Sequence, residues 1–107
     1  MKKAVWLSFD LGVNGDYEGM YTWLADHEAI ECGDSVGFVQ YDSKGKLLDE
    51  LRTDLRTNVE LTKKSRVYVI YRGDDGKVKG SFVFGKRKQA PWTGYGSVRE
   101  EEAVDEL

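Results

Sequence analysis

The residues best suited to bind another molecule are Lys86, Arg87 and Lys88, which Trp92 and Tyr95 follow a few positions later. Cationic side chains attract phosphates and aromatic rings stack on bases, so this spacing favours binding to nucleic acid. The alternative is structural: the cations protect an edge strand from pairing with other chains, while the aromatic rings fold back onto the protein. We slightly prefer the structural interpretation, because an acidic chain does not favour strong, general affinity for nucleic acid.

The charge of the chain changes sign twice along the sequence, although its net value is only −3. Residues 1–57 carry eleven acidic and six basic side chains, whereas residues 58–92 carry nine basic and three acidic ones. Such asymmetry marks either a face that binds anions or a solvated hairpin. If nucleic acid is bound, the candidate contacts are cations of this basic stretch: Lys63, Lys64, Arg66, Lys86, Arg87 and Lys88.

Three other polar features do not make a catalytic site. His27 is the only histidine, and no serine or cysteine nucleophile stands in a recognisable frame with it. Cys32 is expected to be a small buried strand residue, since a lone cysteine packs as an apolar side chain. The acidic turn at residues 73–76 is too short for the ligand loop of an EF-hand. The sequence therefore contains no complete catalytic or cofactor motif.

A length of 107 residues is that of one ordinary domain. We expect the domain to occupy residues 1–88 and a partly disordered C-terminal extension to occupy residues 89–107. No apolar run approaches the roughly 20 residues that span a bilayer, and the apolar stretch near the N-terminus is too short for a secretory signal. These observations predict a protein that does not enter a membrane. One cysteine cannot form an intramolecular disulfide, so we also expect a cytoplasmic location.

Two kinds of apolar periodicity predict the secondary structure. Alternation with a period of two predicts strands over residues 5–11, 29–32, 35–41, 66–72 and 78–86. Helical spacing predicts a first helix that Asp16 caps and that ends near His27. A second helix is predicted to be capped by Asp42 and Ser43, with an apolar face made of Leu47, Leu48, Leu51 and Leu55.

This order of elements predicts an α+β domain of the ferredoxin-like type, strand–helix–strand–strand–helix–strand, with one extra C-terminal strand. The sheet is expected to be antiparallel, with both helices on one face and the last two strands in a hairpin.

The face opposite the helices is predicted to be unusually apolar. Val5, Leu7 and Phe9 face the helices, so Trp6 between them points to the open face. Large apolar side chains on an open face need a cover, which is either a second copy of the chain or the C-terminal segment. We expect a homodimer whose interface includes Trp6, Tyr68, Ile70, Phe82 and Phe84.

Several short segments of the sequence, each two to five residues long, resemble those of one superfamily of small proteins. It contains the CRISPR-associated endoribonucleases of the spacer-adaptation complex, the virulence-associated protein D toxins and the SinR-like proteins. The likeness covers roughly residues 4–72. The matching segments are Leu7-Ser8-Phe9-Asp10-Leu11, Asp16-Tyr17, Met20-Tyr21, Trp23-Leu24 and Gly33-Asp34-Ser35-Val36.

The resemblance implies a ferredoxin-like homodimer in which the final strand, here residues 78–86, often joins the sheet of the partner. It also implies a functional aspartate at the end of the first strand, which is Asp10 in this chain. In that superfamily the aspartates of two protomers can bind a divalent metal such as Mg²⁺, which activates water for phosphodiester hydrolysis. The alternative is that Asp10 accepts hydrogen bonds from the backbone of the turn that it begins.

The function that we expect is that of a non-enzymatic, homodimeric interaction module, because no second acid, base or phosphate clamp accompanies Asp10. The alternatives are a metal-dependent endoribonuclease or other nuclease that uses Asp10, and a nucleic-acid-binding protein without hydrolysis. We expect no cofactor, unless the nuclease alternative holds, which requires a divalent metal such as Mg²⁺.

Overall fold

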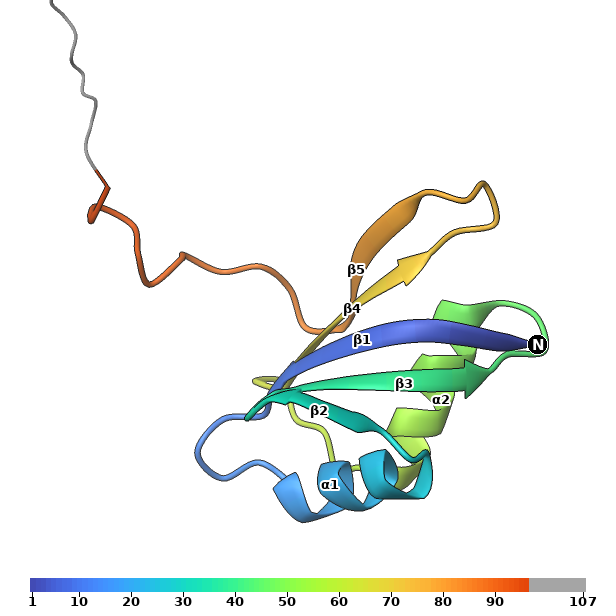
Figure 1. Ribbon diagram of the computed structural model, residues 1–107. Helices are drawn as coiled ribbons and strands as arrows, with labels where there is room; N and C mark the ends of the chain where they lie inside the picture. Colours follow the sequence, from blue (N-terminus) through green and yellow to red (C-terminus); the bar gives the residue numbers. More distant parts are fainter. Residues whose placement is uncertain (97–107) are drawn as a thin grey trace, which may run out of the picture.

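Strand β1 (Lys2–Asp10) forms the centre of a five-stranded antiparallel sheet, and two helices lie on one face of that sheet (Figure 1). The computed structural model describes residues 1–96. Among these residues, no helix is both long enough and apolar enough to cross a membrane. The other elements are α1 (Tyr17–Asp26), β2 (Ile30–Gly33), β3 (Val36–Asp42), α2 (Leu47–Asn58), β4 (Arg66–Arg72) and β5 (Val78–Phe84).

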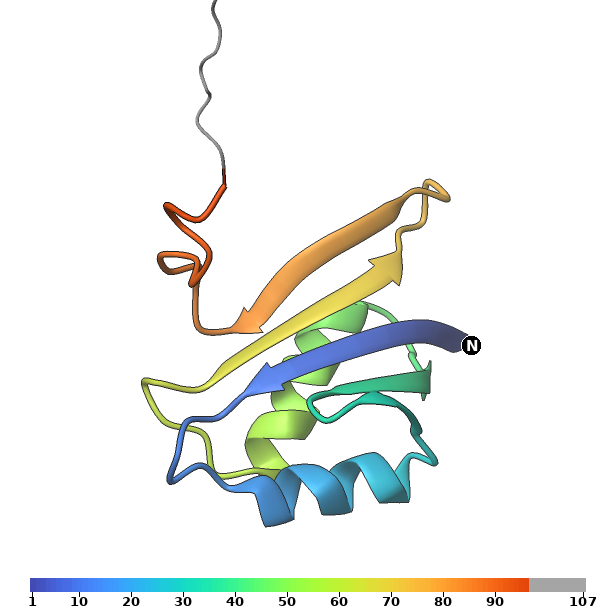
Figure 2. The ribbon, with the colours of Figure 1, turned by 60° about the vertical axis from the view of Figure 1, so that its left-hand side comes forward.

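The strands lie side by side in the order β2-β3-β1-β4-β5, and every neighbouring pair is antiparallel. β1 and β2 are therefore parallel to each other on either side of β3, and β3 and β4 are parallel on either side of β1. Parallel strands need a crossover, which α1 and α2 provide. Figure 2 shows both helices against the same face of the sheet, with the β4–β5 hairpin at one edge. The predicted α+β class, the antiparallel sheet and the hairpin are confirmed.

The core lies between the sheet and the helices because the central strands β1 and β3 bury every second side chain on the helix side. In β1, Val5, Leu7 and Phe9 are buried, whereas the residues between them are exposed. Burying one such side chain contributes about 1.5–3 kcal/mol to folding. The helices cover these positions with Met20, Trp23, Leu47, Leu51 and Leu55.

α1 begins as predicted, after its cap Asp16. One carboxylate oxygen accepts a hydrogen bond from the backbone N–H of Gly19 (2.9 Å), and the other accepts one from that of Glu60 (2.9 Å). The N–H groups of Glu60 and Gly19 lower the pKa of Asp16 below its usual value. One side chain therefore caps α1 and also holds the segment that follows α2. The helix ends at Asp26, with His27 as its C-cap.

The predicted cap of α2 is wrong. Asp42 belongs to β3, where it pairs with Lys2 and where its carboxylate lies 3.1 Å from the N-terminal ammonium group. Because the sheet ladder continues to Asp42, the helix begins only at Leu47, after Lys46. Lys46 makes no side-chain capping bond. The four leucines predicted for this helix do lie in or against the core.

Two strand predictions also need correction. Cys32, expected to be buried, is exposed because β2 is a four-residue edge strand with little cover. β5 ends at Phe84 instead of residue 86, because Gly85 adopts φ +77° and turns the chain away from the ladder. Such a φ strongly favours glycine.

The C-terminal segment at residues 89–96 does not cover the open face. Both views show residues 89–96 running away from the sheet (Figures 1 and 2). Trp92 is 72% exposed and Tyr95 is 86% exposed, so neither ring packs on the domain. The rest of the predicted disordered extension, residues 97–107, lies outside the described residues.

Replacing Gly85 with alanine should destabilise the protein more than the same change at Gly76. Both residues have positive φ, +77° and +82°. A Cβ added at Gly85 would lie 2.7 Å from the carbonyl oxygen of Ser65, whereas nothing lies within 4 Å of a Cβ added at Gly76. We expect Gly76→Ala to lower the free energy of unfolding by about 1 kcal/mol and Gly85→Ala by about 2–3 kcal/mol. Urea titrations measure both changes, and equal losses would contradict the close approach at Gly85.

Candidate functional site

Side chains on the open face align in rungs that cross the sheet. The register pairs connect Ile30 of β2, Phe38 of β3, Trp6 of β1, Ile70 of β4 and Gly80 of β5 in one continuous line. Trp6 is 43% exposed and Ile70 is 41% exposed. The rings of Trp6 and Phe38 contact each other with centroids 4.8 Å apart. An apolar rung therefore runs across the whole open face.

The next rung along the strands carries a second aromatic pair. Ser8 pairs with Tyr68, and Tyr68 pairs with Phe82 across the β4–β5 ladder. The two rings meet edge to face with centroids 4.8 Å apart. Gly80 makes room for this arrangement, because a Cβ at that position would collide with the phenol group of Tyr68. The open face thus presents two aromatic pairs, one from β1 and β3 and one from β4 and β5.

Gly85 brings the basic segment onto this face. The chain turns at Gly85 close against Ser65 and Arg66, and Lys86, Arg87 and Lys88 follow directly. The Arg87 guanidinium carbon lies 5.8 Å from the ring centroid of Tyr68 and 5.5 Å from that of Phe82. A cation within about 6 Å of an aromatic face is attracted to the ring. Arg87 is therefore held over the second aromatic pair.

Asp10 and Arg66 form the last rung of the open face. They are register partners, and a guanidinium nitrogen of Arg66 lies 3.3 Å from a carboxylate oxygen of Asp10. The other oxygen accepts a hydrogen bond from the backbone N–H of Gly12 at 3.2 Å. The Gly12 N–H and, after it, Arg66 lower the pKa of Asp10. The expected structural role of Asp10 in the turn is thus present, together with an ion pair.

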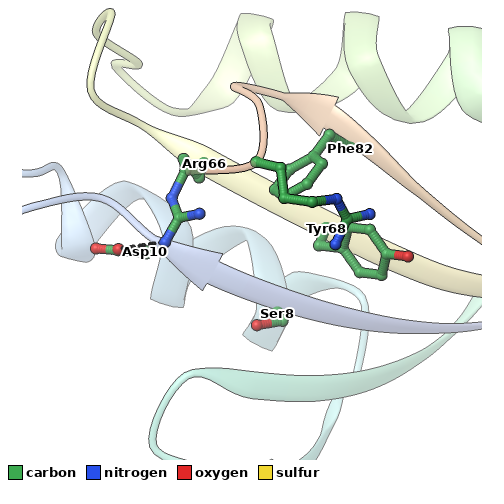
Figure 3. A pocket seen from close by; sticks show the side chains of 6 residues that line it. Ser8, Asp10, Arg66, Tyr68 and Phe82 are labelled. Atoms are coloured by element: carbon green, nitrogen blue, oxygen red, sulfur yellow. Dashed lines mark hydrogen bonds and ion pairs between the residues drawn. The ribbon is translucent and has the colours of Figure 1, made fainter. Parts of the chain in front are cut away.

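These groups line one shallow pocket of about 300 Å³ (Figure 3). Its wall combines two aromatic rings, two guanidinium groups, one carboxylate and the hydroxyl groups of Ser8 and Tyr68. We call this the Asp10 pocket and define it by Ser8, Asp10, Arg66, Tyr68, Phe82 and Arg87. Three strands and the segment that follows β5 contribute to it, and they meet because the register of β1, β4 and β5 aligns them.

The structure brings some of the predicted site residues together and separates others. Arg66 and Arg87 share the Asp10 pocket, whereas Lys63 lies in another groove, beside Asp16 and near the end of α2. Lys64 is exposed in the turn before β4. The basic candidates therefore do not form one cluster.

The predicted interface residues also divide. Trp6, Ile70, Tyr68 and Phe82 share the open face, but Phe84 packs against the core from the helix side, with the Arg56 guanidinium carbon 5.5 Å from its ring centroid. The cause is a register shift between Val67 and Tyr68 in the β4–β5 ladder, which inserts one residue and turns the end of β5 over.

Within one chain the Asp10 pocket does not fit a divalent metal. Hard cations such as Mg²⁺ are held by several oxygen ligands, usually carboxylates. Among residues 1–96, Asp10 is the only acidic side chain that lines the pocket, and it is paired with a guanidinium group. The same residues contain no group of three or more His, Cys, Asp or Glu side chains that could hold a metal.

The strand register shows which residues β3 adds to the open face. Phe38 lies opposite Trp6 and Val36 lies opposite Ser8, so these two residues face the same side as Trp6 and Ser8. The roles of Gly80 and Gly85 were missed altogether. A weak signal for Gly80 was present, because a glycine inside a strand pattern often marks a close approach by another group.

Replacing Arg66 with glutamine should raise the pKa of Asp10 while leaving it below the usual value of 3.8. The variant removes the ion pair but keeps the Gly12 N–H, which is the larger cause of the lowered pKa. Side-chain carboxyl NMR titration measures the change. Asp75, whose pKa is lowered chiefly by the N–H of Lys77, is the internal control and should not change. An unchanged Asp10 pKa would mean that the Asp10–Arg66 pair does not form in solution.

Comparison of the chain with protein-family models, with curated proteins and with solved structures finds no match, so the function must be inferred from the chemistry of the site itself.

Proposed function

We propose that this chain is a non-enzymatic interaction module of the ferredoxin-like type that binds single-stranded nucleic acid on its open sheet face. The observation that carries this proposal is the Arg87 guanidinium, 5.8 Å from the Tyr68 ring on a face that also displays Trp6 and Phe38. Single-stranded nucleic acids are commonly bound by aromatic rings that stack on bases and by cations that contact phosphates.

The order of the elements supports the ferredoxin-like part of the proposal. β1, α1 and β2 form one parallel unit that β3 splits, and β3, α2 and β4 form a second one that β1 splits. This order supports a split β-α-β arrangement of that fold type, with β5 as an added edge strand beside β4. Within residues 1–96 both helices lie on the opposite face, so no helix covers the open face (Figure 2).

The location of the aromatic rings suits a single strand better than a duplex. Trp6 with Phe38 and Tyr68 with Phe82 lie in successive rungs, so they offer two neighbouring stacking positions. Bases in a duplex are stacked on one another and cannot lie flat on such rings without being unpaired. A single strand exposes its bases at no such cost, so it can use both positions.

Charge restricts this binding to one region of the molecule. The chain has a net charge of −3, which disfavours general attraction to a polyanion. Three cations, however, gather at the Asp10 pocket. Arg66 and Lys88 are close enough to interact with Asp10. Arg87 lies over the two aromatic rings. We therefore expect localised binding whose affinity falls as the salt concentration rises.

A second copy of the chain is the second candidate for the open face. Ile70 and Ile30, the latter 61% exposed, extend the Trp6 rung with aliphatic surface that stacks poorly on bases and packs well against protein. In a face-to-face dimer, Asp10 of one copy could approach that of the other. Such a pair would supply the additional carboxylate that a metal-dependent nuclease needs and that one chain lacks.

Replacing Trp6 or Tyr68 with leucine should weaken binding to a fluorescein-labelled 12-nucleotide single strand. Stacking on one ring is worth about 1–3 kcal/mol per base, which corresponds to a loss of roughly fivefold or more in affinity for each variant. Fluorescence anisotropy at low salt measures the affinity. Tyr21→Leu is the matched control, since Tyr21 is 52% exposed but belongs to α1 on the helix side.

Two outcomes of that experiment would contradict nucleic-acid binding. One is the absence of any anisotropy change at low salt, and the other is equal weakening by Tyr21→Leu and Tyr68→Leu. Light scattering on the same samples separates the candidates. A dimer that neither binds the strand nor survives Trp6→Asp would assign the open face to a second copy of the chain.

A further inference from the structure

A second pocket lies on the open face, at the opposite end of β1 and β4 from the Asp10 pocket. Its volume is about 380 Å³. Exposed side chains of β1, β4 and β5 form much of its wall, and we call it the Arg72 pocket. It is lined by Lys2, Lys3, Ala4, Trp6, Tyr71, Arg72, Gly73 and Val78. The Arg72 pocket therefore combines an aromatic ring with cations, as the Asp10 pocket does.

Alternation along the strands places two of these cations on the open face. Lys2 precedes Trp6 by four residues in β1, and Arg72 follows Ile70 by two residues in β4, so both lie on the side of Trp6 and Ile70. Among residues 1–96, neither cation forms a salt bridge with a carboxylate. Asp42, the register partner of Lys2, instead pairs with the N-terminal ammonium group at 3.1 Å. Lys2 and Arg72 are therefore available to bind an anion.

The distribution of charge favours one path for a polyanion across this face. Along the strands, the Asp10 pocket and the Arg72 pocket each supply at least two cationic side chains, one pocket at either end. Across the strands, the Trp6 rung ends in β2, where residues 30–34 contain two acidic side chains and no cation. Phosphates are attracted to the cations and repelled by the carboxylates. We therefore expect a bound strand to follow β1 and β4.

Aromatic surface connects the two pockets. The Tyr68 ring, which lines the Asp10 pocket, leans over Gly80, a member of the Trp6 rung, and Trp6 in turn lines the Arg72 pocket. From Ser8, which lies level with Tyr68, to Lys2 the strand β1 extends by six residues, or about 20 Å. Successive nucleotides of a stacked strand advance by about 3.4 Å. Only a strand of several nucleotides can therefore contact both pockets.

We propose that the bound single strand runs along β1 and β4 and that the Arg72 pocket is its second binding site. Arg87 binds phosphate at one end of the path, and Trp6 stacks on a base in the middle. Lys2 and Arg72 bind phosphate at the other end. This inference rests on the proposed function and adds to it a path and a second pocket.

Backbone amide NMR of the wild-type protein with the 12-nucleotide strand tests the path. We expect the amide signals of Lys2 and Arg72 to shift together with that of Tyr68, because the strand contacts both pockets. The signals of residues 30–33 in β2 should stay in place. Shifts in β2 without shifts at Lys2 and Arg72 would mean that the strand crosses the sheet, and they would overturn the inference.

Arg72→Gln tests the second pocket by removing one cation. The slope of log affinity against log salt concentration should become shallower by about 0.7, the value for one phosphate contact of a single strand. Affinity for the 12-nucleotide strand at low salt should fall severalfold. Arg56→Gln is the matched control, since Arg56 is also exposed but belongs to α2, where it lies over Phe84. An unchanged slope in Arg72→Gln, or an equal change in both variants, contradicts a phosphate contact at Arg72.

The outcomes separate this inference from the proposed function. Binding that shifts signals at the Asp10 pocket but not those of Lys2 and Arg72 overturns the path and leaves single-strand binding standing. Failure of the 12-nucleotide strand to shift any signal or to change anisotropy at low salt overturns the proposed function and the path together. The NMR experiment needs no variant, so a folding defect in Arg72→Gln does not prevent the decision.

Discussion

Strict alternation along β1 is the constraint on which the rest of the structure depends. Because side chains of a strand point to opposite faces in turn, burying Val5, Leu7 and Phe9 beneath the helices forces Trp6, Ser8 and Asp10 onto the other face. A slip of one residue would place a tryptophan and an aspartate in the core and three large apolar groups in solvent. The register of the central strand is therefore strongly determined, and the contents of the open face follow from it.

The open face then becomes a site through interruptions of the regular sheet. Gly80 allows Tyr68 to lie across β5, the register shift beside Val67 keeps Phe82 with Tyr68 while turning Phe84 to the core, and Gly85 ends the strand. Each interruption loses some regular strand structure. Together they place an aromatic pair and a basic segment at the same end of the sheet.

At this end of the sheet, positive and negative side chains lie beside one another, although the sequence around Arg66 and Arg87 is mostly basic. One guanidinium nitrogen of Arg66 pairs with Asp10, and Arg87 lies over two rings, so neither is a freely solvated cation. Cations held in this way lose less conformational freedom on binding than flexible lysines do. The Asp10 carboxylate among them adds a negative charge and a hydrogen-bond acceptor to this end of the sheet.

Much of the fold was predictable from local pattern. Alternation located the strands to within a few residues, and β4 was predicted with its exact bounds, because a run of β-branched and aromatic residues has few other uses. Asp16 was recognised as the cap of α1 because a capping bond joins residues only three positions apart, here Asp16 and the N–H of Gly19. The cap of α2 was missed because Asp42 satisfies local capping rules equally well, and only its pairing with Lys2 assigns it to the sheet. Burial of Cys32 was predicted wrongly for a similar reason, since edge position is a property of the whole sheet.

The sequence by itself determined the class of the domain, the identity of the apolar open-face residues on β1 and β4, and the presence of a basic stretch near the C-terminus. These features depend on periodicity and composition, which can be read from residues that are close together in the sequence. Only the tertiary structure decided that Asp10 meets Arg66, that Phe82 but not Phe84 shares the face with Tyr68, and that Arg87 lies above both rings. The physical reason is that these contacts join residues up to 56 positions apart through strand register, and one inserted residue or one turn with positive φ is enough to redirect a side chain.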